Sequence, residues 1–191
     1  MNESYRELVR KAVDTSLSLG LLQRSEAPSF SSGKIAQSSI FGHLGEFNRH
    51  LHSLGFRDSR SLSGHCIQIH DHLQMFLQHH GVESHITIGS MHGHGWAYCS
   101  VPMDHLLAEL KDPDLSGEVR VHTWLTLNDA SILDWTGQAW YDTQTNENHP
   151  AESCLVYFAQ GEQDESHYYN PVFVGREYLV RTGSIRRVVT S

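Results

Sequence analysis

The chain has 191 residues, 39% of them apolar, and a formal net charge of −8 with histidine counted as neutral. This length suffices to bury one sizeable hydrophobic core, so we expect a single domain over residues 1–191. The basic residues form no cluster that could follow a phosphate backbone, which argues against nucleic acid as a partner.

Hydropathy argues against a membrane partner as well. No stretch reaches the roughly 18 apolar residues that a bilayer-spanning helix needs, and residues 1–20 alternate charged with apolar residues instead of forming a signal-peptide core. The expected location is the cytoplasm, or outside the cell through an export route that reads no hydrophobic signal.

The predicted elements begin with a helix. Ser4 and Glu7 have the spacing of a capping box, and apolar residues then recur at helical spacing through Val13. Residues 24–39 are mostly Ser, Gly, Pro and other polar types and predict a loop. A second helix is predicted over residues 40–54, because Gly55 can supply the left-handed residue that ends it.

A central helix is predicted next. Its apolar stripe starts after Ser63, which we expect to be the N-cap, and stops at Gly81. Two strands should follow, over residues 85–89 and 96–101. Pro102 then opens a short helix through Leu110.

The next predicted unit is a hairpin. Residues 119–127 alternate in the manner of a two-faced strand, Asn128-Asp129 is a turn signal, and residues 131–135 form the return strand. Another strand is predicted over residues 154–159.

The C-terminal region predicts a break at Pro171, a short helix over residues 176–180 and a β-prone tail after Gly183. Helices come first and an antiparallel sheet follows, which is the α+β class. Within the single domain we expect three parts: a helical N-terminal part over residues 1–59, a core over residues 60–137 and an extension over residues 138–191.

The three cysteines are Cys66, Cys99 and Cys154. Their number is odd and they lack CxxC spacing, so we expect neither a disulfide framework nor a zinc knuckle. Cys99 and Cys154 fall in predicted strands, where burial accounts for them.

Fifteen histidines are many for this length and raise the question of metal binding. The pairs His50/His52 and His70/His72 lie on predicted helices, where residues two apart diverge by about 200°, so we interpret them as solvated faces. The loop pair His92/His94 lacks a third ligand. We therefore expect no metal and no other cofactor.

Cys66 would lie in the first turn of the central helix. Unpaired N–H groups and the positive end of the helix dipole stabilise a thiolate there, and the same N–H groups could receive an oxyanion. A thiolate nucleophile needs a base, and the base needs a third group to orient it. His122 and Asp134 meet that need if the hairpin has a three-residue loop centred on Asn128, because they would then face each other directly. A two-residue loop would put them on opposite faces.

Several runs of the chain resemble the transglutaminase-like branch of the papain-like cysteine protease superfamily, in the order Cys, His, Asp. These runs are Gly64-His65-Cys66, His80-Gly81-Val82, Ser84–Gly89, His122-Thr123-Trp124-Leu125 and Ile132-Leu133-Asp134-Trp135-Thr136, all within residues 60–137. The resemblance implies a central helix packed on an antiparallel sheet, with Cys66 as nucleophile, His122 as general base and acid, and Asp134 as the group that orients the histidine. Arg60 occupies the position of the oxyanion glutamine in many papain-like proteases, which leaves the second oxyanion donor unassigned.

The resemblance implies a thiol-dependent amide hydrolase or acyltransferase that acts on a protein or peptide through a thioester. Glutamine deamidation or transglutamination is slightly favoured, as in bacterial deamidases, and the small size suits a dedicated bacterial enzyme such as an effector. The alternatives are a cysteine peptidase of the same fold and a catalytically silent binding module. The acceptor, the substrate and the oligomeric state stay open.

Four residues are expected at the substrate cleft: His65, Trp96, Trp124 and Trp135. The Gly-rich segment from Met91 to Trp96 follows the strand that leaves the central helix and is expected to line the same cleft. The two other tryptophans flank the predicted His and Asp and could exclude water from them.

Overall fold

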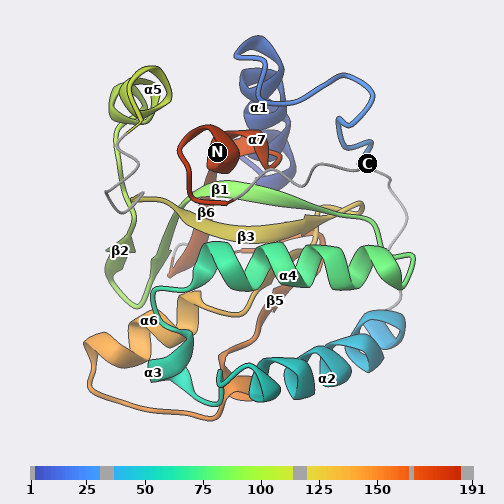
Figure 1. Ribbon diagram of the computed structural model, residues 1–191, viewed down its shortest axis with the longest axis vertical. Helices are drawn as coiled ribbons and strands as arrows, with labels where there is room; N and C mark the ends of the chain where they lie inside the picture. The colour runs from blue at the N-terminus through green and yellow to red at the C-terminus, as the bar shows by residue number, and fades with distance from the viewer. Residues whose placement is uncertain (1–2, 31–36, 114–119, 164–165, 186–191) are drawn as a thin grey trace.

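The computed structural model describes residues 3–30, 37–113, 120–163 and 166–185 (Figure 1). The elements in chain order are α1 (Tyr5–Ser18), α2 (Gln37–Ser53), α3 (Ser59–Leu62), α4 (Cys66–His79), β1 (Ser84–Gly93), β2 (Trp96–Tyr98), α5 (Met103–Lys111), β3 (His122–Leu127), β4 (Ile132–Asp134), α6 (Gly137–Gln144), η1 (Ala151–Cys154), β5 (Val156–Phe158), η2 (Ala159–Gly161), β6 (His167–Val174) and α7 (Glu177–Arg181). Every pairing between the described strands is antiparallel, which confirms the predicted α+β class. None of the described helices is long and apolar enough to cross a bilayer.

Strand β1 is the centre of the sheet. Along one edge it pairs first with β3, over Ser84–Gly89, and then with β2, over Met91–Gly93. Its other edge pairs with β6. Strands β4 and β5 continue the sheet beyond β3. The strand that follows the central helix therefore pairs directly with β2, β3 and β6.

Helices cover both faces of this sheet (Figure 1). On one face, Leu73 of α4 packs in a cluster with Ile86 and Leu125 of the sheet. On the other face, Val9 of α1 packs in a cluster with Trp124. All six residues of β3 are therefore buried, because both faces of this predicted two-faced strand pack against helices.

The polar residues of β3 are buried because α1 brings them partners. The hydroxyl of Thr126 lies 2.6 Å from the hydroxyl of Tyr5 and 2.6 Å from that of Thr87. The Tyr5 oxygen also accepts a hydrogen bond of 2.7 Å from the indole N–H of Trp124. These bonds satisfy polar groups that would otherwise be costly inside the core.

The predicted helices are largely confirmed at their ends. Ser4 and Glu7 form the capping box of α1, and Gly55 and Gly81 have the positive φ values of +98° and +74° that follow α2 and α4. Ser63 is not the N-cap of the central helix. Asp58 caps a separate short helix, α3, of which Ser63 is the C-cap, and α4 begins at Cys66.

Two C-terminal elements were not predicted. Helix α6 follows β4, and β6 runs through Pro171, where a break was expected. The proline fits because β6 is an edge strand and its register with β1 shifts between Ile88 and Gly89, so the missing N–H falls at a bulge. The predicted strand over residues 154–159 is shorter, because a 3₁₀ turn ends at Cys154 before β5.

Some predictions fall partly outside the described residues. These are the loop over residues 24–39, of which residues 31–36 are not described, the first residue of the 119–127 strand, and the tail after residue 185.

The close approach of β1 and β6 gives a stability test. A Cβ at Gly89 would overlap the carbonyl oxygen of Asn170 and meet the Trp124 ring at 3.0 Å. Gly89→Ala should therefore lower the free energy of unfolding by about 2–4 kcal/mol in urea titrations. Gly45→Ala is the matched control: nothing lies within 4 Å of that position in α2, so it should be neutral or stabilising by up to about 1 kcal/mol. Equal effects of the two changes would contradict this β1–β6 packing.

Candidate active site

Cys66 is the first residue of α4 and is only 4% exposed. The N–H groups of a first helical turn have no acceptor within the helix, so they and the helix dipole favour an anion at this position. The sulfur lies 3.7 Å from the carbonyl oxygen of Val121, the residue before β3. The helix start thus brings the thiol to the beginning of the strand that carries His122.

His122 and Asp134 form a buried pair. Nε2 of the imidazole lies 2.7 Å from Oδ2 of the carboxylate, and neither residue is exposed to solvent. Nδ1 is also buried and makes no hydrogen bond of regular geometry within the described part of the chain. Since Nε2 is engaged by Asp134, Nδ1 is the nitrogen left to interact with the thiol.

The pair forms in a different register from the predicted one. The hairpin has three loop residues, but Leu127 pairs with Ser131 and Leu125 with Leu133, so the loop is centred on Asp129 rather than Asn128. Ala130 ends the loop with φ +67°. Because the loop centre moves by one residue, the residue opposite each position of β3 moves by two. Side chains alternate between faces with every residue, so His122 and Asp134 still point to the same face of the sheet. His122 consequently lies diagonal to Asp134 instead of directly opposite, a separation that long side chains can bridge.

Asp134 accepts hydrogen bonds on both carboxylate oxygens. Oδ1 accepts from the backbone N–H groups of Thr136 at 2.8 Å and Gly137 at 3.1 Å, where α6 begins. Oδ2 accepts from the Tyr169 hydroxyl at 2.9 Å as well as from His122. Burial raises the pKa of this carboxyl, but His122 and the hydrogen bonds outweigh it and hold the pKa well below its usual range. Asp134 is therefore a carboxylate.

His70 is a further buried group at this site. Its Nε2 accepts the backbone N–H of Trp135 at 3.0 Å, so the proton is on Nδ1, which donates to the carbonyl oxygen of Cys66 at 2.9 Å. Burial lowers its pKa to about 4, which keeps it neutral. The interpretation of the His70/His72 pair as a solvated face is therefore wrong for His70. Its spacing from Ile69, Leu73 and Leu77 on the buried stripe was a signal for this.

Cys66 and His122 shift each other's pKa in opposite directions. Burial raises the pKa of the thiol, but His122, and then the N–H and hydroxyl of Thr123, lower it further than burial raises it. Burial lowers the pKa of His122, but Asp134 and the sulfur raise it overall. Both shifts favour a thiolate–imidazolium pair at neutral pH.

The other two cysteines have raised thiol pKa values, in contrast to Cys66. Burial, and then the charge of Cys66, raise the pKa of Cys99 to about 12. Burial also raises the pKa of Cys154, to about 11. A protonated thiol is a poor nucleophile, so only Cys66 of the three is activated.

Tyr98 packs on the imidazole, and Trp140 packs on Tyr98. The Tyr98 ring centroid is 4.9 Å from that of His122, and its other neighbour is the Trp140 ring, stacked at 4.4 Å. Tyr98 belongs to β2, the short strand that ends before the positive-φ residue Cys99. Neither Tyr98 nor Trp140 was predicted at this site from the sequence.

The four residues expected at the substrate cleft lie in different parts of the structure. His65 is exposed, but its Nδ1 lies 3.1 Å from the Ser63 carbonyl and its ring packs on Phe56. Trp96 is 48% exposed in the β1–β2 hairpin. Trp124 and Trp135 are core side chains with almost no exposed surface, so neither indole lines an open cleft.

Two other sequence expectations concern neighbouring positions. Met91 is buried in the same hydrophobic cluster as residues of α1. The Gly-rich segment therefore begins in the core, and its first residue lines no open cleft. Arg60, at the expected oxyanion position, is exposed on α3, and its backbone N–H donates to the Asn148 side chain at 3.2 Å. It supplies no oxyanion donor.

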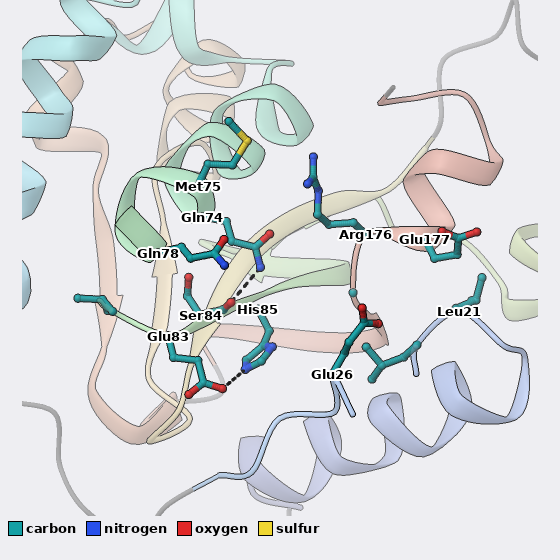
Figure 2. Close-up of a pocket in the computed structure, with 13 residues that line it drawn as sticks. Leu21, Glu26, Gln74, Met75, Gln78, Glu83, Ser84, His85, Arg176 and Glu177 are labelled. Atoms are coloured by element: carbon teal, nitrogen blue, oxygen red, sulfur yellow. Dashed lines mark hydrogen bonds and ion pairs between the residues drawn. The ribbon is translucent and has the colours of Figure 1, made fainter. Parts of the chain in front are cut away.

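A surface pocket of about 410 Å³ lies at the other end of α4. Figure 2 shows it between the C-terminal half of that helix, the start of β1 and the segment before α7. Its one histidine, His85, lies 3.6 Å from Glu83 and 3.3 Å from Asn128. None of the described lining residues is a cysteine, so the thiol chemistry of Cys66 is separate from this pocket.

No known protein family, characterised protein or solved structure with which the chain was compared matches it.

The contacts of Thr123 predict a change in thiol acidity. Thr123→Val keeps the shape but removes a hydroxyl that lowers the pKa of the Cys66 thiol, so this pKa should rise by less than it does in His122→Ala. His122→Ala leaves burial as the main influence and should raise that pKa above its ordinary value. The ultraviolet absorbance of the thiolate, followed against pH and corrected with a Cys66→Ser chain, measures both. An unchanged pKa in His122→Ala would rule out the pairing.

The neutral state of His70 predicts a loss of stability in acid. Its folded pKa is about 4, below the ordinary value of 6.5, so the unfolded chain binds the extra proton between these values. This contribution is complete above pH 6.5 and falls by up to about 3 kcal/mol as the pH drops to 4. Urea titrations at pH 7 and 4.5 should show a smaller loss in His70→Gln than in the unaltered chain. Equal losses would mean that His70 is not the buried neutral group.

Proposed function

We propose that the protein is a thiol-dependent amide hydrolase or acyltransferase that acts on a protein or peptide through a thioester at Cys66. The observation that supports this most strongly is the arrangement of three buried groups. A cysteine with a lowered pKa begins a helix, and a histidine beside it is held through its other nitrogen by a carboxylate. This is the nucleophile, base and orienting group that acyl transfer requires.

The reaction can be followed atom by atom. The Cys66 thiolate attacks the amide carbonyl, and N–H groups at the start of α4 receive the oxyanion. The His122 imidazolium gives its proton to the departing nitrogen, the C–N bond breaks, and ammonia or an amine leaves a thioester. Neutral His122 then takes a proton from water or an acceptor amine, which attacks the thioester. The acyl product leaves, and the thiolate–imidazolium pair is restored.

The finer fold assignment is part of this proposal. Cys66 begins the helix that packs on an antiparallel sheet, and His122 and Asp134 follow on neighbouring strands of that sheet. This order is the one expected of the transglutaminase-like branch of the papain-like superfamily. Residues outside the expected core complete the site, since Tyr169 of β6 bonds to Asp134.

Seclusion of the sulfur favours a side-chain amide as the substrate. Cys66 is 4% exposed and His122 is not exposed at all. A slender glutamine side chain can reach a recessed sulfur past Tyr98 with a smaller displacement than an extended peptide chain needs. Deamidation or transglutamination is therefore favoured over peptide cleavage.

The reaction can be tested with glutamine-containing peptides, with and without an added primary amine. The full-length protein should release ammonia and form a Cys66 acyl adduct that is visible by intact-mass spectrometry. His122→Ala should lower the rate by at least about 10³-fold and Asp134→Asn by about 10²–10⁴-fold. Cys99→Ser is the matched control and should stay within about threefold, because its thiol has a raised pKa.

The products separate the alternatives. Ammonia without incorporated amine indicates a deamidase, incorporated amine a transglutaminase, and new peptide termini a cysteine peptidase. A silent binding module would give none of these, and its Cys66 would be alkylated no faster near neutral pH than Cys99. That pattern would overturn the proposed function.

A further inference from the structure

Three metal-binding side chains converge where α2 meets the end of α4. His43 and Glu46 are three residues apart on α2 and therefore share a helix face. His80 is the C-cap of α4. The nearest ligand atoms of these three residues all lie within 4.8 Å of one another, and Nε2 of His80 is 4.0 Å from the Glu46 carboxylate.

The packing of His80 holds its ring in position. Its centroid lies 4.3 Å from that of His43 and 4.5 Å from that of Phe76. His80 and His43 are half-buried, whereas Glu46 is exposed and free to rotate towards them. A site with two restrained imidazoles and one adjustable carboxylate loses little side-chain entropy when it binds an ion.

The donor set suits Zn²⁺. Two imidazole nitrogens and one carboxylate oxygen are a known zinc ligand set, with water in the fourth position. Tetrahedral zinc bonds of about 2.0–2.1 Å separate the ligand atoms by about 3.3–3.5 Å. Since all the ligand atoms lie within 4.8 Å of one another, the gaps must close by at most about 1.4 Å. Rotation of the Glu46 side chain and a small shift of the His43 ring suffice for this.

A groove beside this cluster gathers further histidines. Its volume is about 460 Å³, and Glu46, His50, His72, Met75, Phe76 and His79 line it. Figure 1 shows α2 beside α4, with the blue N-terminal end of α2 nearest the end of α4. Glu46 is common to the groove and the cluster. Five of the fifteen histidines of the chain thus lie at one junction between two helices. Only two of them, His50 and His72, belong to the pairs interpreted as solvated faces.

A second group of possible ligands is less suited to a metal. Asp142, Glu147 and His149 also lie together, but the Asp142 carboxylate already accepts hydrogen bonds from Ser59 and from Gln138. Binding an ion there would break these bonds. Among the described residues, the His43, Glu46 and His80 group has no comparable set of hydrogen bonds to lose.

We propose that His43, Glu46 and His80 bind one Zn²⁺, which clamps the first half of α2 to the C-terminal end of α4. Cys66 begins the same helix, and fourteen helical residues span about 21 Å, so the clamp is distinct from the thiol site. The expected role is to stabilise the packing of the helix that positions the thiol.

The test titrates Zn²⁺ alone against the full-length Cys66→Ala chain, because the thiolate is itself a zinc ligand. A competing chromophoric chelator should report one zinc per chain. Zn²⁺ at 100 times its Kd should raise the Tm by about 5–10 °C. His80→Ala and His43→Ala should weaken binding by more than about 100-fold, since even changes outside the ligand shell cost 10–100-fold.

His105→Ala is the matched control. His105 pairs with Glu109 at 3.5 Å on α5, so it offers a histidine and a carboxylate without a second histidine. Binding and the Tm shift should be unchanged in this variant. Glu46→Gln changes only the carboxylate and should weaken binding at least tenfold even if the histidine variants fold poorly. Tight binding that persists in Glu46→Gln and His80→Ala, or that disappears in Cys66→Ala, would overturn the proposal.

Discussion

The buried carboxylate of Asp134 is the group on which the rest of the site depends. A charge without solvent exposure must be compensated by hydrogen bonds, and these come from β3, from β6 and from the start of α6. The position is closely packed as well, because a Cβ on Gly137 would approach the carboxylate to 2.5 Å. The requirement to satisfy one carboxylate therefore fixes where three elements meet, and with them the orientation of His122.

Two histidines near this carboxylate acquire opposite protonation properties. His122 points Nε2 at Asp134, and its pKa is raised despite burial. His70 turns an unprotonated nitrogen towards the Trp135 N–H, and burial lowers its pKa to about 4. The difference follows from hydrogen-bond partners rather than residue type. One histidine can then carry the proton of the proposed reaction, while the other anchors α4 to β4 without competing for it.

Helix α4 links the thiol site and the proposed zinc site. Its first residue is Cys66, and His80 follows its last turn. A helix moves largely as a rigid element. A zinc clamp between α2 and the C-terminal end of α4 would therefore also limit movement of the Cys66 thiol relative to His122. Precise positioning of this kind matters in acyl transfer, where small displacements of reacting atoms are costly.

The sequence by itself determined the local features. The capping box of α1, the glycines that follow α2 and α4 and the α+β class could be inferred from spacing and residue type. The pairing of His122 with Asp134 was predicted only for a three-residue loop, which the hairpin has. The capping-box and glycine signals depend on neighbours within a few residues.

Only the tertiary structure decided the remaining features. The hairpin register differs from the predicted one. In the hairpin loop Asp129 accepts the Ser131 N–H and Ala130 adopts a positive φ, and the residue types alone do not select this loop conformation. His70, Tyr169 and the His43, Glu46 and His80 group acquire their roles from partners distant in sequence. A side chain's hydrogen bonds and burial depend on which distant segments fold against it, and no local pattern encodes that.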